Sequence, residues 1–302
     1  MVSHAAAAAM NYEGRIIRPP SEADSLILQV AVGCSHNRCT FCPAFKEKKF
    51  RIKSFDDIKR DIRQAAAVYG ADSVRRVFLC DGDPLILPQN RLIEIFDELN
   101  AAFPRLQRVG IYGNAKSVLR KSSDDLAELK KRRLGIVYLG LESGDPVTLV
   151  RICKGATVEQ MVEAGLKIRQ AGIKLNVTVL LGIGGTERSR VHSVETMRVL
   201  NRMKPNHIGA LTLMVVPGTQ LYDEMKKGDF VLPDKFELVR ELRDMIAESE
   251  LENCLFFSNH ASNYFPVQAR LPKDKETILQ QLDFVLSSRN DKHLRKEFMR
   301  GL

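Results

Sequence analysis

Three of the chain's six cysteines lie within nine residues, in the segment GCSHNRCTFC at positions 33–42. Cys34, Cys39 and Cys42 follow directly after LILQVAV (26–32), an apolar run typical of a buried strand. The other three cysteines are scattered singly, so the spacing does not indicate a disulfide framework. A tight cysteine cluster in a reducing compartment more often binds a metal or does redox chemistry. The sequence therefore predicts a metal or redox centre in this loop.

Two metal centres fit three thiols in one loop. In the first, His36 joins the three cysteines in a closed four-ligand zinc site. Such sites usually pair two Cys-x-x-Cys knuckles, and the sequence has no second knuckle. In the second, the thiolates hold a [4Fe–4S] cluster, which normally takes four cysteines. The missing fourth thiolate then leaves one iron open to bind another molecule, and the residues alone leave both alternatives open.

The elements around this loop follow a repeating α/β pattern. Apolar, strand-like runs alternate with segments of helical period as far as about position 216. Continuous apolar strands separated by helices are typical of a parallel sheet with right-handed crossovers. The predicted strands are 26–33, 75–80, 108–113, 135–143, 173–185 and 206–216, and the predicted helices between them are 54–70, 88–104, 122–134, 157–172 and 189–204.

This pattern predicts an α/β fold, a partial (β/α)6 barrel of the TIM type with parallel strands and a C-terminal helical extension. A parallel barrel carries its chemistry on the loops that follow the strands, and the cysteine loop is one of them. We expect a disordered leader over 1–20, a barrel core over 21–219 and an extension packed on the barrel over 220–302. Within the last part, 217–230 is predicted as a loop, 253–272 as irregular, and 233–250 and 273–288 as helices.

The composition is that of a globular protein with a substantial core, with 302 residues of which 44% are hydrophobic and 27% charged. The apolar runs are far shorter than a membrane span, and the N-terminus lacks the charged region of a signal peptide. We therefore predict a cytoplasmic protein with no membrane contact. The net charge of +9 collects in the stretches 46–53, 130–133 and 289–302. We interpret these as solvated helix ends and loops, and nucleic acid as a possible but less favoured partner.

The spacing Cys-x4-Cys-x2-Cys, with Phe41 before the last cysteine, resembles the cluster motif of the radical S-adenosylmethionine superfamily. The usual family spacing has three residues, not four, between the first two cysteines. The resemblance spans roughly residues 26–219 and implies that Cys34, Cys39 and Cys42 hold one [4Fe–4S] cluster. In that family the open iron chelates S-adenosylmethionine, and the reduced cluster cleaves it to a 5′-deoxyadenosyl radical. The radical then abstracts hydrogen from a substrate, which the sequence does not identify.

Further stretches at predicted strand ends resemble the family's cofactor-binding segments. DGDPL (81–85) resembles a GGEP-like motif, in which the backbone and the acid contact the methionine amino group. The resemblance assigns this role to Gly82, Asp83 and Pro84. The sequence departs from the motif where Asp81 replaces the first glycine and Asp83 replaces the glutamate.

YLGLESG (138–144) supplies Glu142, which the resemblance assigns to the ribose hydroxyls of S-adenosylmethionine. An acid at the end of an apolar strand needs a partner, and a neighbouring basic side chain is the alternative to the ribose. RICKGAT (151–157) resembles the segment whose basic residue pairs with the methionine carboxylate. Lys154 is assigned to this role, with Arg151 as an alternative.

The predicted strand over 173–185 carries two more candidates. Gly182, in LLGIGGTE (180–187), resembles a glycine-rich segment whose backbone approaches the adenine closely. Asn176 is a polar residue in an apolar setting, and we predict that it reaches the ribose. VVPGT (215–219) resembles a further stretch near the adenine and the substrate.

The remaining candidates divide between site and structure. Cys80 is best explained as a small buried hydrophobe beside the site. FSNHASNYFP (257–266) is interpreted equally well as a substrate-facing lid and as a structural loop. The resemblance also implies an electron donor such as a flavodoxin or ferredoxin. The alternative functions are a haem carrier, with His260 or His207 as axial ligand, and a zinc-stabilised nucleic-acid-binding protein.

Overall fold

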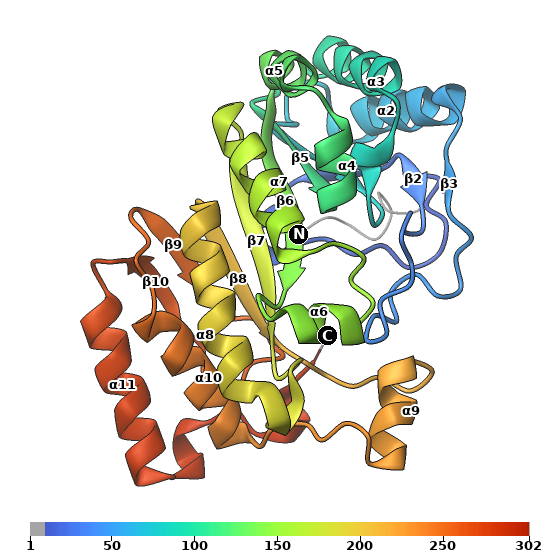
Figure 1. Ribbon diagram of the computed structural model, residues 1–302. Coiled ribbons are helices and arrows are strands. Elements are labelled where there is room, and N and C mark those ends of the chain that lie inside the picture. Colours follow the sequence, from blue (N-terminus) through green and yellow to red (C-terminus); the bar gives the residue numbers. More distant parts are fainter. Residues whose placement is uncertain (1–9, 302) are drawn as a thin grey trace. The chain divides into compact units, whose positions relative to one another are not determined.

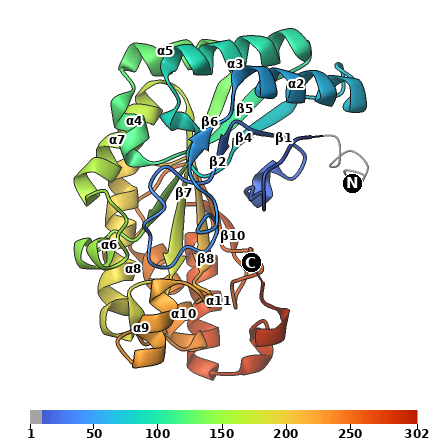
Figure 2. The ribbon, with the colours of Figure 1, turned by 90° about the vertical axis from the view of Figure 1, so that its right-hand side faces the viewer.

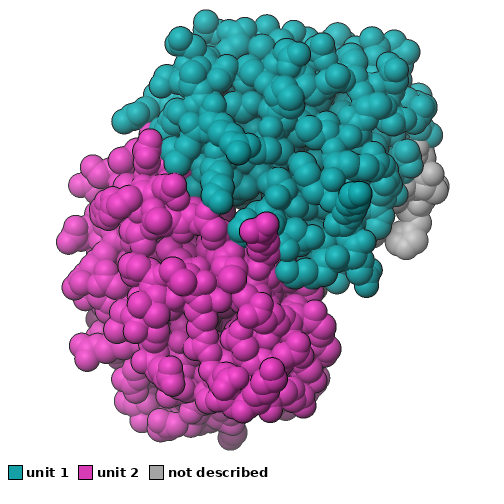
Figure 3. Space-filling model, turned by 45° about the vertical axis from the view of Figure 1, so that its right-hand side comes forward, with its two compact units in different colours: residues 1–37, 44–138, 167–174 teal, residues 38–43, 139–166, 175–302 magenta. Residues whose placement is uncertain are grey.

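The computed structural model describes residues 10–301. It divides into two compact units, coloured separately in Figure 3. Unit 1 consists of the residues up to Asn37, Ala44–Tyr138 and Lys167–Lys174; unit 2 consists of Arg38–Pro43, Leu139–Leu166 and the residues from Leu175 onward. In the described part of the chain, no helix is long and apolar enough to cross a membrane.

The strands of residues 10–301 form a main sheet of eight strands, in the order β1-β4-β5-β6-β7-β8-β9-β10, and a two-stranded ribbon, β2-β3 (Figure 1). The pairs β1–β4, β4–β5, β7–β8 and β8–β9 are parallel, and β9–β10 is antiparallel. The six predicted strands and the predicted α/β class are confirmed. The bounds are β1 Leu26–Gln29, β2 Ala31–Val32, β3 Arg51–Ile52, β4 Arg76–Cys80, β5 Arg108–Gly113, β6 Leu134–Glu142, β7 Lys174–Leu181, β8 His207–Thr212, β9 Cys254–Phe257 and β10 Gln268–Leu271.

The helices of unit 1 begin and end where the sequence supplies caps. Ser54 accepts a hydrogen bond from the backbone nitrogen of Asp57 (3.1 Å), and Gly70 ends the same helix with φ +83°. Ser122 and Asp125 form a capping box at a second helix. Figure 2 shows α2, α3 and α5 side by side over the strands of this unit. The bounds are α2 Phe55–Tyr69, α3 Gln89–Ala102, α4 Ala115–Arg120 and α5 Ser123–Lys131.

One face of the strands in unit 1 carries a cluster of apolar side chains that includes Ile27, Phe78 and Cys80. The rings of Phe78 and Tyr112 meet edge-on, with centroids 4.8 Å apart. Cys80 is completely buried, and burial raises the pKa of its thiol. The prediction that Cys80 is a small buried hydrophobe is confirmed.

The predicted disordered leader over 1–20 needs correction. Residues 1–9 lie outside the described residues, but residues 10–20 pack on unit 1. Met10 is buried, and the hydroxyl of Tyr12 donates to the carbonyl oxygen of Ile27 (2.8 Å). The backbone nitrogen of Glu13 donates to the side chain of Gln29 (2.8 Å). The prediction is wrong for 10–20, because these contacts join distant parts of the sequence and leave no local pattern.

The short helix η1 (Pro20–Glu22) continues this segment and buries the carboxylate of Glu22 completely. Arg108, on β5, donates to it at 2.6 and 2.8 Å. The hydroxyl of Tyr138, on β6, also donates to it. Glu22 therefore ties the N-terminal segment to two strands of unit 1.

In unit 2, helix α10 packs against α8 and α11. The segment predicted as a loop over 217–230 contains a helix, α9, which Thr219 caps at its start. The segment predicted as irregular over 253–272 contains β9 and β10, and β9 pairs with β8. These two predictions are wrong, whereas the predicted boundary between a core over 21–219 and an extension over 220–302 stays a prediction. The bounds are α6 Pro146–Arg151, α7 Val158–Gln170, α8 Gly185–Met203, α9 Gln220–Lys227, α10 Lys235–Ala247 and α11 Lys275–Ser288.

Candidate functional site

The three clustered cysteines are all partly exposed, whereas Cys80 and Cys254 are buried. Cys34 belongs to unit 1, and Cys39 and Cys42 belong to unit 2, so each end of the loop is described within its own unit. Within residues 10–301, no group of three or more His, Cys, Asp or Glu side chains is arranged to hold a metal ion. The joint role of the three thiols stays a prediction.

The turn after β4 lies against the first cysteine. The backbone nitrogen of Gly82 donates to the carbonyl oxygen of Gly33 (3.1 Å). A Cβ atom at position 82 would lie 2.7 Å from the Cβ of Cys34, a distance that real Cβ atoms essentially never show. Only glycine fits here without displacing the cysteine. Pro84 is buried and begins the short helix η2 (Pro84–Ile86).

Asp83 is fully buried, and its carboxylate is already well supplied with donors. Its Oδ2 accepts from the hydroxyls of Ser35 and Ser117, both at 2.5 Å, and from the side-chain nitrogen of Asn114 (2.7 Å). Burial raises the pKa of Asp83 to about 6, although these hydrogen bonds lower it. The three donors were not predicted from the sequence. A signal for two of them was available, because Ser35 lies inside the cysteine loop and Asn114 follows β5 directly.

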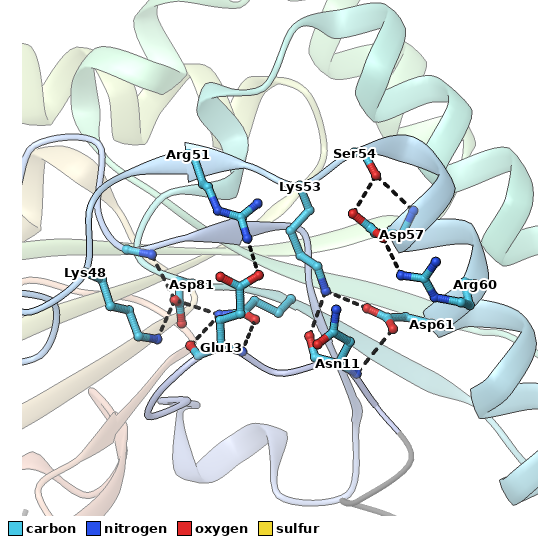
Figure 4. A network of polar contacts seen from close by, with 12 residues as sticks. Asn11, Glu13, Lys48, Arg51, Lys53, Ser54, Asp57, Arg60, Asp61 and Asp81 are labelled. Carbon is cyan, nitrogen blue, oxygen red and sulfur yellow. Dashed lines mark hydrogen bonds and ion pairs between the residues drawn. The ribbon is translucent and has the colours of Figure 1, made fainter.

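Asp81, which replaces a glycine of the motif, is also fully buried. Its Oδ2 accepts from Lys48 (2.8 Å), from the side chain of Gln29 (3.0 Å) and from the backbone nitrogen of Gly33 (3.0 Å). Figure 4 shows Lys48 pointing toward Asp81 within a larger network of charged side chains. The other oxygen, Oδ1, is buried and has no hydrogen-bond partner within residues 10–301.

The second half of the cysteine loop is fixed within unit 2 by its backbone. The nitrogen of Thr40 donates to the carbonyl oxygen of Ile152 (3.0 Å), and the nitrogen of Leu221 donates to that of Thr40 (3.1 Å). The ring of Phe41 packs against a buried apolar cluster that includes Ile152 and Leu221. The residues between Cys39 and Cys42 are therefore anchored on the segments that end α6 and begin α9.

The end of β6 and the segment after α6 bring two predicted residues together. The ammonium of Lys154 lies 2.9 Å from a carboxylate oxygen of Glu142, and both side chains are mostly buried. The basic partner that the sequence analysis held as the alternative for Glu142 is thus Lys154. Arg151 lies elsewhere, 3.6 Å from Glu224 and over the ring of Phe230.

Asp145, in the turn after β6, was not predicted. Arg188 donates to both of its oxygens, at 2.6 and 2.8 Å, and Thr148 donates from its backbone nitrogen and its hydroxyl. Burial raises the pKa of Asp145, but the hydrogen bonds from Arg188 and Thr148 outweigh it and lower the pKa to about 2. Asp145 therefore holds the turn after β6 onto α8 as a charged group.

A buried chain of polar groups runs from this turn to Gly182. Nδ1 of His192 lies 2.8 Å from the hydroxyl of Ser143, and Nε2 lies 3.8 Å from the carboxylate of Glu241, beyond hydrogen-bond distance. The backbone nitrogen of Gly182 donates to Glu241 (2.6 Å), and so does the hydroxyl of Ser189 (2.7 Å). Burial raises the pKa of Glu241 to about 8 and lowers that of His192 to about 4. Both groups are thus uncharged near pH 6.

Gly182 is needed where it lies. Its φ is +85°, and a Cβ atom there would lie 2.8 Å from the side chain of Leu238 on α10. Its amide is already bonded to Glu241, so the position serves the contact between β7 and α10. The predicted approach to the adenine stays a prediction.

Asn176 does not lie with the other predicted residues. It is the third residue of β7, paired in register with His207, whereas Gly182 follows the last residue of that strand. At about 3.3 Å per residue, the two positions are roughly 20 Å apart. Asn176 is therefore at the amino end of β7, away from the edge where a parallel barrel carries its chemistry, and we do not retain its predicted contact with the ribose.

The segment 257–266 is held by hydrogen bonds of the side chain of Asn263 and of its own backbone. Asn263 is buried, accepts from the hydroxyl of Thr212 (2.8 Å) and donates to the carbonyl oxygen of Ala210 (2.9 Å). Arg295 donates to the carbonyl oxygens of His260 (2.8 Å) and Asn263 (2.8 Å). These contacts favour the structural loop over the substrate-facing lid.

The sequence model of the radical SAM superfamily matches residues 28–197, more than half of the chain. The chain therefore belongs to the radical SAM superfamily. An uncharacterised protein of Methanocaldococcus jannaschii is 24% identical over 257 residues, which are 82% of this chain and 74% of that protein. GTP 3′,8-cyclase 1 of Pseudomonas aeruginosa is 27% identical over 170 residues, 55% of this chain and 49% of the cyclase.

Two solved structures share the fold. Methylornithine synthase has a TM-score of 0.53 and 16% identity, covering 86% of this chain and 81% of the synthase. The radical S-adenosylmethionine methyltransferase of Kitasatospora setae, with cobalamin and a [4Fe–4S] cluster bound, has a TM-score of 0.56 and 18% identity, covering 72% of this chain and 44% of the methyltransferase. At these identities the likeness shows the fold alone. The chain spans less than half of the methyltransferase and about half of the cyclase.

Membership of the superfamily makes the protein a radical SAM enzyme, with a [4Fe–4S] cluster and S-adenosylmethionine as its cofactors. The chemistry of the available donors, though not their arrangement, fits the cluster. Its ligands are thiolates, and the loop offers three thiols that are all partly exposed. The close approach of the turn after β4 to Cys34 also requires that position 82 has no side chain. The superfamily match favours this centre over the zinc site with His36.

Proposed function

We propose that Cys34, Cys39 and Cys42 hold one [4Fe–4S] cluster, and that the turns after β4, β6 and β7 contact S-adenosylmethionine. When bound, the cluster and S-adenosylmethionine supply a 5′-deoxyadenosyl radical that abstracts hydrogen from a substrate. The superfamily match over 28–197, which contains all three thiols, is the observation that carries the proposal. The subclass of reaction and the substrate are left open.

The turn after β4 offers the methionine amino group mainly its backbone. Three donors already bind Oδ2 of Asp83, whereas Oδ1 accepts from the backbone nitrogen of Asn114 at 3.2 Å. Oδ1 has two lone pairs and one donor, so it can take a second donor. We therefore propose that the amino group binds the backbone oxygens of 82–84 together with Oδ1 of Asp83. Gly82 and Pro84 shape this turn.

Glu142, at the end of β6, and Lys154, after α6, offer opposite charges on adjacent side chains. Glu142 would accept from the ribose hydroxyls, and Lys154 would pair with the methionine carboxylate. An ammonium has three donors and each carboxylate oxygen two lone pairs, so the two side chains can keep their mutual contact while binding the cofactor. Gly182 would present backbone to the adenine.

The partners and the location follow from the proposed chemistry. A one-electron donor such as a flavodoxin or ferredoxin would reduce the cluster. We propose a cytoplasmic location, because a cysteine cluster that holds a metal centre is typical of a reducing compartment.

The test is anaerobic reconstitution of the purified chain with iron and sulfide, followed by dithionite and S-adenosylmethionine. We expect release of 5′-deoxyadenosine, measured by chromatography, and its loss in Cys39→Ala together with the bound iron. His36→Ala is the matched control and keeps its iron, since only the zinc site uses His36. A protein that takes up zinc but no iron contradicts the proposal. A cluster that forms without cleavage, in a protein that binds haem stoichiometrically, supports the haem carrier.

A further inference from the structure

Two acidic residues on one turn bind the two neighbours of the first cysteine. Asp81 and Asp83 flank Gly82, and Gly33 and Ser35 flank Cys34. The backbone nitrogen of Gly33 donates to Oδ2 of Asp81 (3.0 Å), and the hydroxyl of Ser35 donates to Oδ2 of Asp83 (2.5 Å). The two triplets therefore run side by side and are joined at both ends.

Between these two side-chain contacts, the two segments are also joined by a hydrogen bond between backbone atoms. The nitrogen of Gly82 donates to the carbonyl oxygen of Gly33 (3.1 Å), and the absence of a side chain at 82 lets the turn reach Cys34. Gly33 has φ +77°, a conformation that favours glycine, so the chain can turn sharply just before the cysteine. The position of the Cys34 backbone is thus set by three separate contacts within unit 1.

Each carboxylate is itself held in place by other residues. Lys48 and Gln29 donate to Asp81, and Lys48 also donates to the carbonyl oxygen of Arg15 (2.7 Å). Ser117 and Asn114 donate to Asp83 from the segment that follows β5. Figure 4 shows the Asp81 side of this arrangement, where Lys48 approaches the carboxylate. The acids are fully buried, so neither is free to turn toward solvent.

We propose that Asp81 and Asp83 are positioning residues for Cys34, which hold this thiol in its ligand position before the cluster is bound. The inference rests on the proposed role of Cys34 as an iron ligand. It also explains why the turn departs from the GGEP-like motif at these two positions, because both departures bind the cysteine loop. A ligand held by surrounding hydrogen bonds loses less conformational freedom when the metal centre binds.

The test compares Ser35 and Ser117, which both donate to Oδ2 of Asp83 at 2.5 Å. Of the two, only Ser35 lies in the cysteine loop. In metal-free full-length protein, the alkylation rates of Cys34, Cys39 and Cys42 are followed by mass spectrometry. We expect Ser35→Ala to raise the rate at Cys34 by roughly fivefold, the factor that corresponds to one lost hydrogen bond. Cys39 and Cys42 keep their rates, and Ser35→Thr restores the rate at Cys34.

The control variant is Ser117→Ala, which removes the other hydroxyl from Asp83 and leaves the bond to Ser35 intact. A second pair compares Gly82→Ala, whose Cβ would press on Cys34, with Gly209→Ala, whose Cβ would meet only Leu211 at 3.9 Å. We expect faster loss of iron to a chelator from reconstituted Ser35→Ala and Gly82→Ala than from the two controls.

Two results would overturn the proposal. One is an unchanged rate at Cys34 in folded Ser35→Ala, and the other is an equal increase in Ser35→Ala and Ser117→Ala. A wild-type protein that binds no iron would instead overturn the proposed function, because the alkylation rates are measured without metal.

Discussion

Asp83, in the turn after β4, and Asp145, in the turn after β6, are both buried, but their surroundings differ. Asp83 accepts from two hydroxyls and an amide, whereas Asp145 accepts from the guanidinium of Arg188 and from the hydroxyl and backbone nitrogen of Thr148. Burial acts on both, yet the pKa of Asp83 is raised to about 6 and that of Asp145 is lowered to about 2. The guanidinium that faces Asp145, together with the donors of Thr148, thus favours its charged form more strongly than the neutral donors favour that of Asp83. The two strand ends therefore stabilise a buried aspartate with different kinds of hydrogen-bond donor.

Glu241 extends this comparison to a third carboxylate. It has only neutral donors, Ser189 and the amide of Gly182, and nearby Glu237 and Asp244 raise its pKa further. Its pKa of about 8 is the highest of the three carboxylates. The pKa of the neighbouring His192 is lowered by burial, so no charged imidazole compensates it near neutral pH.

The largest expected effect is at the charged turn. Asp145→Ala removes both bonds to Arg188 and the cap of α6, and we expect a loss of about 2–3 kcal/mol in the free energy of unfolding. This corresponds to a fall of roughly 4–10 °C in Tm, measured by thermal unfolding. Glu195→Ala, which breaks an exposed pair with Arg198, is the control and costs about 0.5 kcal/mol or less. Equal losses in the two variants would show that burial of the pair is irrelevant.

The second effect is a pH dependence at Glu241. Because its folded pKa is raised above the ordinary 4.5, its stabilising contribution is fully present below about pH 4.5 and is lost as the pH rises through about 8. Glu241→Gln cannot ionise. The Tm of the wild type should therefore fall relative to this variant between about pH 4.5 and about pH 8, and the difference should then stay constant. A difference that does not change with pH would mean that Glu241 is charged in the folded protein.

A smaller effect separates the two aspartates directly. Asp83→Asn keeps an oxygen for its hydroxyl donors, and we expect it to cost about 1 kcal/mol in the free energy of unfolding. Asp145→Asn removes the charge that faces Arg188 and should cost more. Urea unfolding of both variants at one pH measures the difference. The reverse order would contradict the idea that the cation determines the contribution of the carboxylate.

The smallest stability effect is expected at Glu142. Glu142→Gln weakens one ion pair with Lys154, at a cost of about 1 kcal/mol or less. If the proposed function is correct, the same change lowers the affinity for S-adenosylmethionine by roughly tenfold, measured by calorimetry on the reconstituted protein. Lost stability with unchanged affinity would assign Glu142 a structural role only.

The sequence supports the strands and long helices well, because their periods and caps are local. Ser54 and Gly70, for example, mark both ends of α2 by their residue types alone. The prediction of a loop over 217–230 was wrong, although Thr219 and Gly228 cap α9. An eight-residue helix has only about two turns, too few for its apolar periodicity to stand out in the sequence. The strands β9 and β10 are four residues each, and β9 exists through its pairing with β8.

In the candidate site, too, local features could be predicted from the sequence and contacts between distant segments could not. The cysteine spacing and Gly82 are visible in the sequence, whereas the bonds from Ser35, Asn114 and Ser117 to Asp83 join separate segments of the chain. Asn176 shows a different limit of the sequence. The alternation of residues along a strand indicates on which face of the sheet a side chain lies, but not how close that residue is to the end of the strand that carries the site. The contact between Glu241 and Gly182 spans 59 residues and has no spacing signal at all.

The buried carboxylate of Glu22 sets an order of events during synthesis. Ser25 donates to it locally, but its partners on the strands, Arg108 and Tyr138, are made 86 and 116 residues later. At roughly 5–20 residues per second, a ribosome needs about 6–23 s to reach Tyr138 after Glu22. Until then the acid lacks the guanidinium and the phenol that offset the cost of its burial, so we expect the segment around Glu22 to take its place only after β6 is made.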